Sequence, residues 1–469
     1  MRRAKIIATL GPASCSDETI EELIKAGANV FRLNLAHGTP ETHHQTADRV
    51  RGVASKVSSK IGILADLPGT KMRTGILDGG EAYLGTGSQF VLFNKARKGD
   101  ATGVSTTVLL LEKLVQIGDE VFLADGEITL RVLSVINKNV VTEVVQGGIL
   151  RSNKGMFLPA AEKRVRAFTN ADQNSLKLAL DLKADMVGLS FVRDAKDLEK
   201  IREFLPKRGE LPRLIAKIET RSAVENLAEI VEAADGIMIA RGDLGIQTSI
   251  QRLPILQKEI IQLCNERGKT VITATQMLES MCKSPRPTRA EVADIANAVF
   301  DGADALMLSE ETAIGEFPIE AVTTMAEVIK SSETYPVRLV ARRYPQNLHE
   351  DQTSWALAHA AVNASEYLGV KAILCPTRTG ATAQRVAAFR PKIPILAFSI
   401  NPNTLGSLTL DWGVVPLEMP VTPSVIEEVK SIMRITKQLG YAKSGDEVAI
   451  IAGTTKKTGG TDYVRILPV

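Results

Sequence analysis

The feature that most constrains the fold of this chain is a regular alternation of short apolar segments and longer amphipathic ones. The apolar segments have the length of buried strands, and the amphipathic segments have helical spacing. Outside one interruption, eight strand-like segments end near Leu10, Leu35, Asp66, Ser190, Glu219, Arg241, Thr275 and Ser309. Eight strand–helix units are what a closed (β/α)8 TIM barrel requires, so the sequence predicts an α/β protein built on this barrel.

The alternation stops between about residues 75 and 154, where short β-rich pieces are separated by glycines and polar turns. Such a block reads as a small β domain inserted after the third strand. A polar, proline-containing passage follows residue 332, and the alternation then resumes as an open α/β domain. We therefore expect four segments: 1–74 and 155–334 form the barrel, 75–154 an inserted β lid domain, and 335–469 a C-terminal α/β domain.

Polar side chains follow nearly every predicted barrel strand, and the functional sites of such barrels lie at the carboxyl ends of the strands. An open doubly wound sheet would instead concentrate these side chains at one switch point. Two neighbouring strands end in the same pattern of a cation, one residue and a carboxylate, at Lys217 and Glu219 and again at Arg241 and Asp243. Residues two apart lie on one side of a strand, so we expect each pair to point together.

Charges at the mouth of an apolar core are costly unless they meet each other, a metal or a ligand. Two structural ion pairs would be the simpler interpretation. The repeat on the adjacent strand favours a site, in which the carboxylates suit a divalent ion and the cations suit a phosphate.

The composition argues against several classes of protein. The formal net charge of +3, with no basic stripe among aromatic residues, indicates no nucleic-acid partner. The four cysteines show no C-x-x-C spacing, which favours neither a zinc site nor a disulfide framework and fits a reducing, cytoplasmic location. No segment reaches transmembrane length, and the apolar run near the N-terminus is broken by Gly11 and Pro12, so we expect no membrane partner.

Four motifs make the chain resemble the pyruvate kinase family: VITATQMLESM at 271–281, PRPTRAE at 285–291, IARGDLG at 239–245 and FRLNLAHG at 31–38. The resemblance covers essentially the whole chain. It implies a barrel A domain, an inserted small β-barrel lid domain and a C-terminal open α/β regulatory domain, assembled as a homotetramer. The implied reaction transfers the phosphoryl group of phosphoenolpyruvate to ADP, giving pyruvate and ATP in the last step of glycolysis.

The resemblance also implies roles for the strand-end residues. Glu219 and Asp243 would bind Mg²⁺, with Mn²⁺ as an alternative, in keeping with the preference of Mg²⁺ for few protein ligands. Lys217 would sit on the transferring phosphoryl group, and Arg32 would hold its phosphate. The backbone at Gly242 and Asp243 would receive the substrate carboxylate at the start of a short helix, where a side chain at Gly242 would obstruct the approach.

Thr275 would hydrogen-bond the same carboxylate and lie on the proton path to the enolate carbon, through a water relay with Ser309 and Glu311. The alternative is an ordinary strand-end hydroxyl. The nucleotide phosphates would meet residues that match the family positions, together with a lysine of the insert: Asn34, His37, Arg73 and Lys154. Read alone, His37 would be an ordinary turn histidine and Lys154 a solvated surface lysine.

The sequence departs from the family at its K⁺ site, which uses an Asn and a Ser on the second strand and an Asp and a Thr on the third. Asn34 and Asp66 remain, but Ala36 and Leu67 replace the other two ligands. Lys71 stands where the family usually has a glutamate. Its ammonium group would supply the charge of the lost ion, so we predict an enzyme that does not require K⁺. Alternatively, Lys71 points to solvent and K⁺ binds weakly through the remaining groups.

In the C-terminal domain, a threonine-rich turn precedes a helix and resembles the family's effector loop; the candidate residues are Thr377, Thr379, Gly380 and Thr382. Backbone N–H groups and hydroxyls at a helix start can hold phosphate. Residues 459–461 would form a second wall. The turn therefore predicts a phosphorylated allosteric effector, although a Thr-capped helix would share this sequence.

Two other functions are compatible with parts of the pattern. A Mg²⁺-dependent pyruvate- or oxaloacetate-type barrel lyase also uses a Glu and an Asp from adjacent strands, but it has no need of Arg32, Lys217 and Arg73 around a phosphoryl group. A non-catalytic metabolite sensor would not need Thr275 in addition to binding groups.

Overall fold

The computed structural model describes residues 2–69, 72–108, 110–159, 168–206, 211–335, 351–454 and 460–469. Eight parallel strands close into the predicted barrel: β1 (Lys5–Thr9), β2 (Val30–Asn34), β3 (Gly62–Asp66), β12 (Met186–Leu189), β13 (Arg213–Ile218), β14 (Gly236–Ala240), β15 (Thr270–Ala274) and β16 (Ala305–Leu308). Their order around the barrel follows the chain, and β1 pairs with β16 to close it. The strands are almost entirely buried, which is why they read as apolar runs in the sequence.

Helices surround the barrel: α1 (Asp17–Ala26), α2 (Pro40–Lys56), α3 (Asn170–Asp181), α4 (Ala195–Phe204), α5 (Arg221–Glu225), α6 (Leu227–Ala233), α8 (Leu253–Glu266), α9 (Arg289–Asp301) and α11 (Pro318–Thr334). Side-chain caps mark several starts; Thr39, Thr169 and Thr288 each form a capping box. The single helix expected over 221–233 is interrupted at Asn226 and becomes α5 and α6. Among the described residues, no helix is both long and apolar enough to cross a membrane.

The strand ends differ from the prediction at one of the two charged motifs. β13 ends at Ile218 and is followed by Glu219, but β14 already ends at Ala240, and Arg241 begins helix α7 (Arg241–Gln247). Residues two apart on a helix do not face the same way. The expectation that Arg241 and Asp243 point together is therefore wrong.

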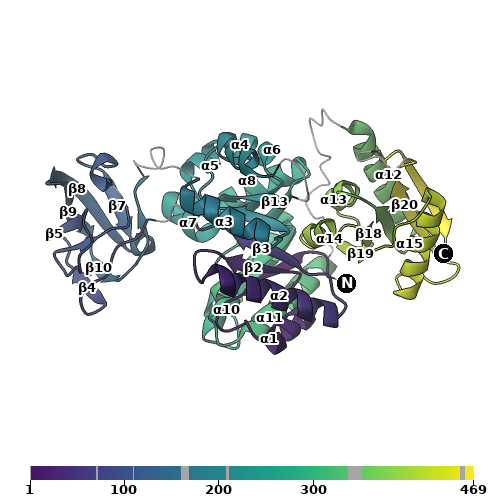
Figure 1. Cartoon of the computed structure of the whole chain (residues 1–469), viewed down its shortest axis with the longest axis horizontal. Coiled ribbons are helices and arrows are strands. Elements are labelled where there is room, and N and C mark those ends of the chain that lie inside the picture. Colours follow the sequence, from purple (N-terminus) through teal and green to yellow (C-terminus); the bar gives the residue numbers. More distant parts are fainter. Residues whose placement is uncertain are drawn as a thin grey trace.

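The inserted segment lies to one side of the barrel (Figure 1). Its strands are β4 (Glu81–Leu84), β5 (Gln89–Phe93), β6 (Gly103–Ser105), β7 (Glu120–Leu123), β8 (Ile128–Ile136), β9 (Asn139–Gln146), β10 (Gly148–Arg151) and β11 (Met156–Phe157). They form a six-stranded sheet of order β11-β7-β8-β9-β5-β6 and a two-stranded sheet of β10 and β4 around a separate apolar core. Within the described residues, this segment is a small all-β unit inserted in the barrel sequence, as expected, and its strands form these two sheets.

The C-terminal region lies on the opposite side of the barrel (Figure 1). Its five-stranded sheet has the order β19 (Val414–Glu418), β18 (Ile395–Ser399), β17 (Ile373–Pro376), β20 (Glu447–Ala452) and β21 (Tyr463–Pro468), and only β21 is antiparallel to its neighbour. Helices α12 (Gln352–Leu368), α13 (Ala381–Ala388), α14 (Pro402–Leu408) and α15 (Val425–Gln438) accompany it. The predicted open α/β architecture is confirmed, while the domain boundaries at 74, 154 and 334 stay predictions.

Short helices complete the described elements: η1 (Leu111–Lys113), η2 (Ala124–Gly126), η4 (Ile250–Arg252), η5 (Glu279–Cys282) and α10 (Glu310–Ala313). α10 and η5 lie in the loops that follow β16 and β15, at the carboxyl end of the barrel. The barrel residues named from the sequence as catalytic or metal-binding lie at the ends of these strands or in the loops that follow them.

Candidate active site

Two cations converge on one buried carboxylate at the ends of β2, β3 and β13. Arg32 Nε lies 2.8 Å from Asp66 Oδ2, and Lys217 Nζ lies 3.3 Å from each oxygen of Asp66. Burial acts to raise the pKa of Asp66, but Lys217 and Arg32 together outweigh it and hold this pKa below its ordinary value. Asp66 therefore stays ionised and fixes the two cations beside each other.

Lys217 has further partners that fix its ammonium group. Its Nζ lies 3.0 Å from Glu219 Oε1, as the sequence predicted for these two residues, and donates a 2.8 Å hydrogen bond to Ser190 Oγ. Burial acts to lower the pKa of Lys217, but Asp66 and Glu219 raise it above its ordinary value. The side chain therefore remains charged although only 10% of it is exposed.

Ser190 is a positioning residue to which the sequence assigned no role. Its hydroxyl accepts from Lys217 and donates to the backbone carbonyl of Leu67 at 2.8 Å. The only signal in the sequence was its place at the end of a predicted strand.

Glu219 and Asp243 form the carboxylate pair expected to hold a divalent ion. Phe191 N–H donates to Glu219 Oε2 at 2.8 Å. Burial raises the pKa of Glu219, and the charge of Asp243 adds to this effect, while Lys217 opposes it. No cluster of three or more His, Cys, Asp or Glu side chains suited to a metal occurs within the described residues. Two oxygen ligands from the protein, completed by water and substrate, fit Mg²⁺ better than an ion held wholly by protein.

Thr275 lies beside the start of α7. Gly242 N–H donates to Thr275 Oγ1 at 2.9 Å, and this hydroxyl donates to the Ala274 carbonyl at 2.7 Å. Thr275 and Gln276 both have positive φ, at 66° and 53°. This conformation is strained for a β-branched residue such as Thr275. A Cβ added at Gly242 would come no closer than 3.7 Å to Thr275 Oγ1, so the protein alone leaves room for a side chain there.

Arg241 holds this strained turn in place. Its guanidinium donates to the carbonyls of Ala274 at 3.2 Å and Thr275 at 2.6 Å, and it forms a 2.6 Å ion pair with Asp294. A further bond reaches the Gln276 carbonyl at 3.3 Å. The sequence suggested that this cation faces a phosphate. In the structure, the guanidinium of Arg241 instead binds the backbone carbonyls on either side of Thr275 and so fixes the position of this residue.

Replacing Arg241 by lysine should lower kcat by about tenfold to a hundredfold, because one ammonium cannot satisfy several carbonyls and a carboxylate at once and small misplacements of reacting groups are costly. Steady-state kinetics and a thermal midpoint would measure the effect. Asp294→Asn is the matched control, since it removes the charge partner but leaves the carbonyl bonds, so kcat should fall less. Unchanged kcat in Arg241→Lys would show that the turn needs no such support.

Glu311 is bonded to the backbone of the neighbouring loops. It accepts from Ser309 N–H at 2.7 Å and Leu278 N–H at 3.0 Å, and burial raises its pKa. In the part of the chain that the structure describes, Thr275 and Ser309 share no direct hydrogen bond. The predicted relay would therefore require water, and it stays a prediction.

The predicted nucleotide residues lie in two places: Asn34 and His37 at and after the end of β2, and Arg73 and Lys154 beside the inserted segment. Asn34 Oδ1 accepts from Ala36 N–H at 3.2 Å, and the carbonyl of His37 lies 2.7 Å from His43 Nε2. Arg73 Nη1 donates to the Asn153 carbonyl at 3.0 Å, and the Lys154 N–H bonds Thr74 Oγ1 at 3.1 Å. Arg73 and Lys154 thus lie on adjacent segments at the junction of insert and barrel. Lys71 lies outside the described residues.

The C-terminal turn predicted as an effector loop surrounds a cavity of about 220 Å³, which Thr377, Thr379 and Thr382 line. Gly380 N–H donates to Thr377 Oγ1 at 2.9 Å, and Gly380 has φ of 90°. Thr382 Oγ1 lies 2.9 Å from Thr461 Oγ1, and Gly460 and Thr461 line the same cavity; the effector site itself stays a prediction.

Comparison with known proteins finds one family for both the barrel and the C-terminal α/β region. A family model described as "Pyruvate kinase, barrel domain" matches residues 1–322, and one described as "Pyruvate kinase, alpha/beta domain" matches residues 355–467. The pyruvate kinase of Thermococcus litoralis is 43% identical, over 100% of this chain and 98% of the relative. That of Thermotoga maritima is 39% identical over the full length of both, and that of Mycobacterium tuberculosis is 38% identical over 99% and 98%.

Proposed function

The chain belongs to the pyruvate kinase family, and we propose that it transfers the phosphoryl group of phosphoenolpyruvate to ADP without requiring a monovalent cation. The observation that carries the proposal is the cluster at the strand ends, where Asp66 holds both Arg32 and Lys217 while Glu219 pairs with the same lysine. Phosphoryl transfer leaves the protein mainly positioning and charge neutralisation to perform, and this cluster suits both tasks.

Lys217 and Arg32 would have different roles in binding the transferring phosphoryl group. The ammonium is a compact charge that can follow the phosphoryl group, whereas the guanidinium fork of Arg32 fixes the orientation of the phosphate. Mg²⁺ or Mn²⁺, held by Glu219 and Asp243, would neutralise charge on the substrate oxygens. Because the protein supplies only these two ligands, the ion would share its remaining positions with substrate and water.

The substrate carboxylate would lie against the backbone of Gly242 and Asp243 and the hydroxyl of Thr275. Its position beside Thr275 would place the enolate carbon within reach of a proton carried by water from Ser309 and Glu311. Since the protein leaves space at Gly242, a need for glycine there would come from the substrate.

ADP would approach from the side of the inserted segment. Asn34, His37 and Arg73 would meet its phosphates, and Lys154 would add a charge from the insert. These side chains give the nucleotide a separate set of contacts from those of phosphoenolpyruvate, which allows in-line transfer between them.

Independence from K⁺ rests on the sequence around the third strand. The family's serine and threonine ligands are Ala36 and Leu67 in this chain, and Lys71 stands where the family usually has a glutamate. Leu67 is buried, and its backbone carbonyl accepts a hydrogen bond from the Ser190 hydroxyl. Asp66, a remaining family ligand, already has two cationic partners.

Regulation and assembly belong to the same proposal. A phosphorylated effector would bind the cavity at Thr377, Thr379, Gly380 and Thr382, and the enzyme would work as a cytoplasmic homotetramer like the family it resembles. The threonine hydroxyls and the helix start provide the polar groups that a phosphate requires.

A lactate-dehydrogenase-coupled assay with phosphoenolpyruvate, ADP and Mg²⁺ tests the proposal, run in potassium-free tetramethylammonium buffer and again with KCl. We expect the full rate in both. A rate that appears only with KCl would retain the reaction and refute independence from K⁺. No pyruvate in either buffer, with folded protein and effectors present, would favour the lyase or the sensor.

A further inference from the structure

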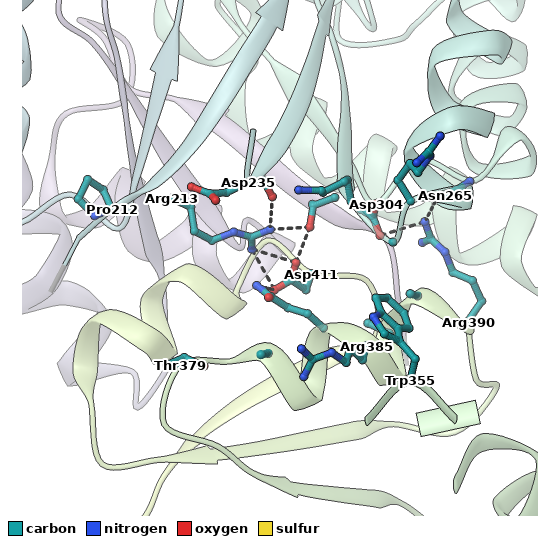
Figure 2. A pocket seen from close by; sticks show the side chains of 18 of the residues that line it. Pro212, Arg213, Asp235, Asn265, Asp304, Trp355, Thr379, Arg385, Arg390 and Asp411 are labelled. Carbon is teal, nitrogen blue, oxygen red and sulfur yellow. Dashed lines mark hydrogen bonds and ion pairs between the residues drawn. The ribbon is translucent and has the colours of Figure 1, made fainter. Parts of the chain in front are cut away.

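A cavity of about 480 Å³ lies between the N-terminal ends of several barrel strands, β13 and β15 among them, and the C-terminal region. Figure 2 shows Arg213 and Asp235 of the barrel on one side and Trp355 and Arg385 of the C-terminal region on the other. Its volume lies within the range of about 300–1,000 Å³ typical of small-molecule sites. The cavity is distant from the cluster described above, which lies at the opposite end of the barrel.

The side chains that line the cavity carry more positive than negative charge. The cations are Arg202, Arg213, Arg267, Lys269, Arg385 and Arg390, and the carboxylates are Asp235, Asp304 and Asp411. Each carboxylate pairs with one arginine, and the N–O distances are 2.9 Å for Arg213–Asp411, 2.8 Å for Arg202–Asp235 and 2.9 Å for Arg390–Asp304. These pairs account for all three negative charges of the lining and leave three cations.

The three remaining cations come from both walls. Arg267 and Lys269 precede β15, and Arg385 lies on α13. Among the described residues, Arg267 forms an ion pair with Glu232 at 2.5 Å and Arg385 forms one with Asp351 at 2.7 Å, and neither carboxylate lines the cavity.

Lys269 is the most constrained of the three. It donates to the carbonyls of Glu232 at 3.0 Å and Ala234 at 2.7 Å, and within the described residues it forms no salt bridge. Burial lowers its pKa, and the carboxylates of Asp235 and Glu232 only partly oppose this effect. An anion in the cavity would stabilise the charged form of this lysine.

We propose that this interdomain cavity binds a small polyanion, a metabolite that carries phosphate groups or several carboxylates. Cations from two walls can each contact a different group of such a ligand, and charge-assisted hydrogen bonds to phosphate or carboxylate are the strong ones.

Two elements connect the cavity to other functional parts. Thr379 and Arg385 line both this cavity and the smaller one at the effector turn, so one segment separates the two. Strand β15 begins at Thr270, which lines the cavity, and ends at Ala274, next to Thr275. A bound polyanion would therefore contact segments that lead to both sites.

Binding can be measured without any catalytic activity. The chain has two tryptophans, and Trp412→Phe leaves Trp355, in the cavity wall, as the only one. Inorganic triphosphate and citrate would be titrated separately against this protein in metal-free buffer containing EDTA. We expect a saturable change in Trp355 emission; the tighter of the two probes identifies the preferred group as phosphate or carboxylate.

Replacing both Arg267 and Lys269 by glutamine should raise the Kd of the tighter probe by about tenfold or more, since two charged contacts are lost. Arg385→Gln, on the opposite wall, should also raise it and serves if the double variant does not fold. Two controls should keep the original Kd: Thr382→Val in the smaller cavity and Lys217→Met in the active site. The absence of a saturable change with either probe, or an equal rise in Kd with Thr382→Val, would overturn the proposal.

Discussion

Replacing Lys217 by methionine should lower kcat by about three orders of magnitude or more, with a smaller effect on the KM for ADP. In the function proposed above, this ammonium would face the transferring group, and preorganised charges in a water-poor site make large contributions to catalysis. Asp66 and Glu219 would also lose their common cationic partner. Leaving a buried charge uncompensated costs about 3–5 kcal/mol, so the thermal midpoint must be measured alongside the kinetics.

Lys217→Arg separates catalysis from stability. It restores a positive charge between the carboxylates, but the larger planar head cannot occupy the place of the ammonium. We expect a thermal midpoint near that of the parent protein together with a kcat still reduced by about a hundredfold or more. If Lys217→Arg recovered most of the activity, the role of Lys217 would be limited to charge compensation within the fold.

Ser190→Ala is the matched test of positioning. It removes the hydroxyl that accepts from Lys217 but leaves both ion pairs intact. A modest fall in kcat, smaller than for either Lys217 variant, is what the geometry predicts.

Much of the fold could be predicted from the sequence because the barrel strands are buried on both faces. A buried parallel strand reads as an uninterrupted apolar run, and β13 and β15 both end within one residue of the predicted positions. The same reasoning placed Lys217 and Glu219 together, because β13 continues almost to the carboxylate.

Arg241 shows where a sequence pattern ceases to determine structure. Its motif has the same spacing as that of Lys217 and Glu219, but β13 runs one residue past Lys217, whereas β14 ends one residue before Arg241 and a helix begins at the arginine. The periodicity of two then no longer applies, and the side chain turns to the carbonyls after β15. Neither the positive φ of Thr275 nor the partners of Ser190 could be predicted, since both depend on contacts between strands distant in sequence.

If Lys71 replaces the monovalent cation as proposed, replacing it by glutamate should lower the rate in potassium-free buffer by about a hundredfold, because the change exchanges that positive charge for a negative one. KCl should restore only part of this rate, since Ala36 and Leu67 lack the oxygens of the family's K⁺ ligands. Adding Ala36→Ser and Leu67→Thr to the variant should increase the recovery. The coupled assay, with and without KCl, measures all three forms.

The control for charge alone is Lys443→Glu, an exposed lysine of the C-terminal region, which makes the same change in net charge far from the barrel mouth. Its rate should match that of the parent protein in both buffers. Full activity of Lys71→Glu without potassium would mean that Lys71 points to solvent and that the remaining groups suffice. A parent enzyme that itself needs KCl would refute the built-in cation before any variant is made, because a lysine that replaces the ion must make added K⁺ unnecessary.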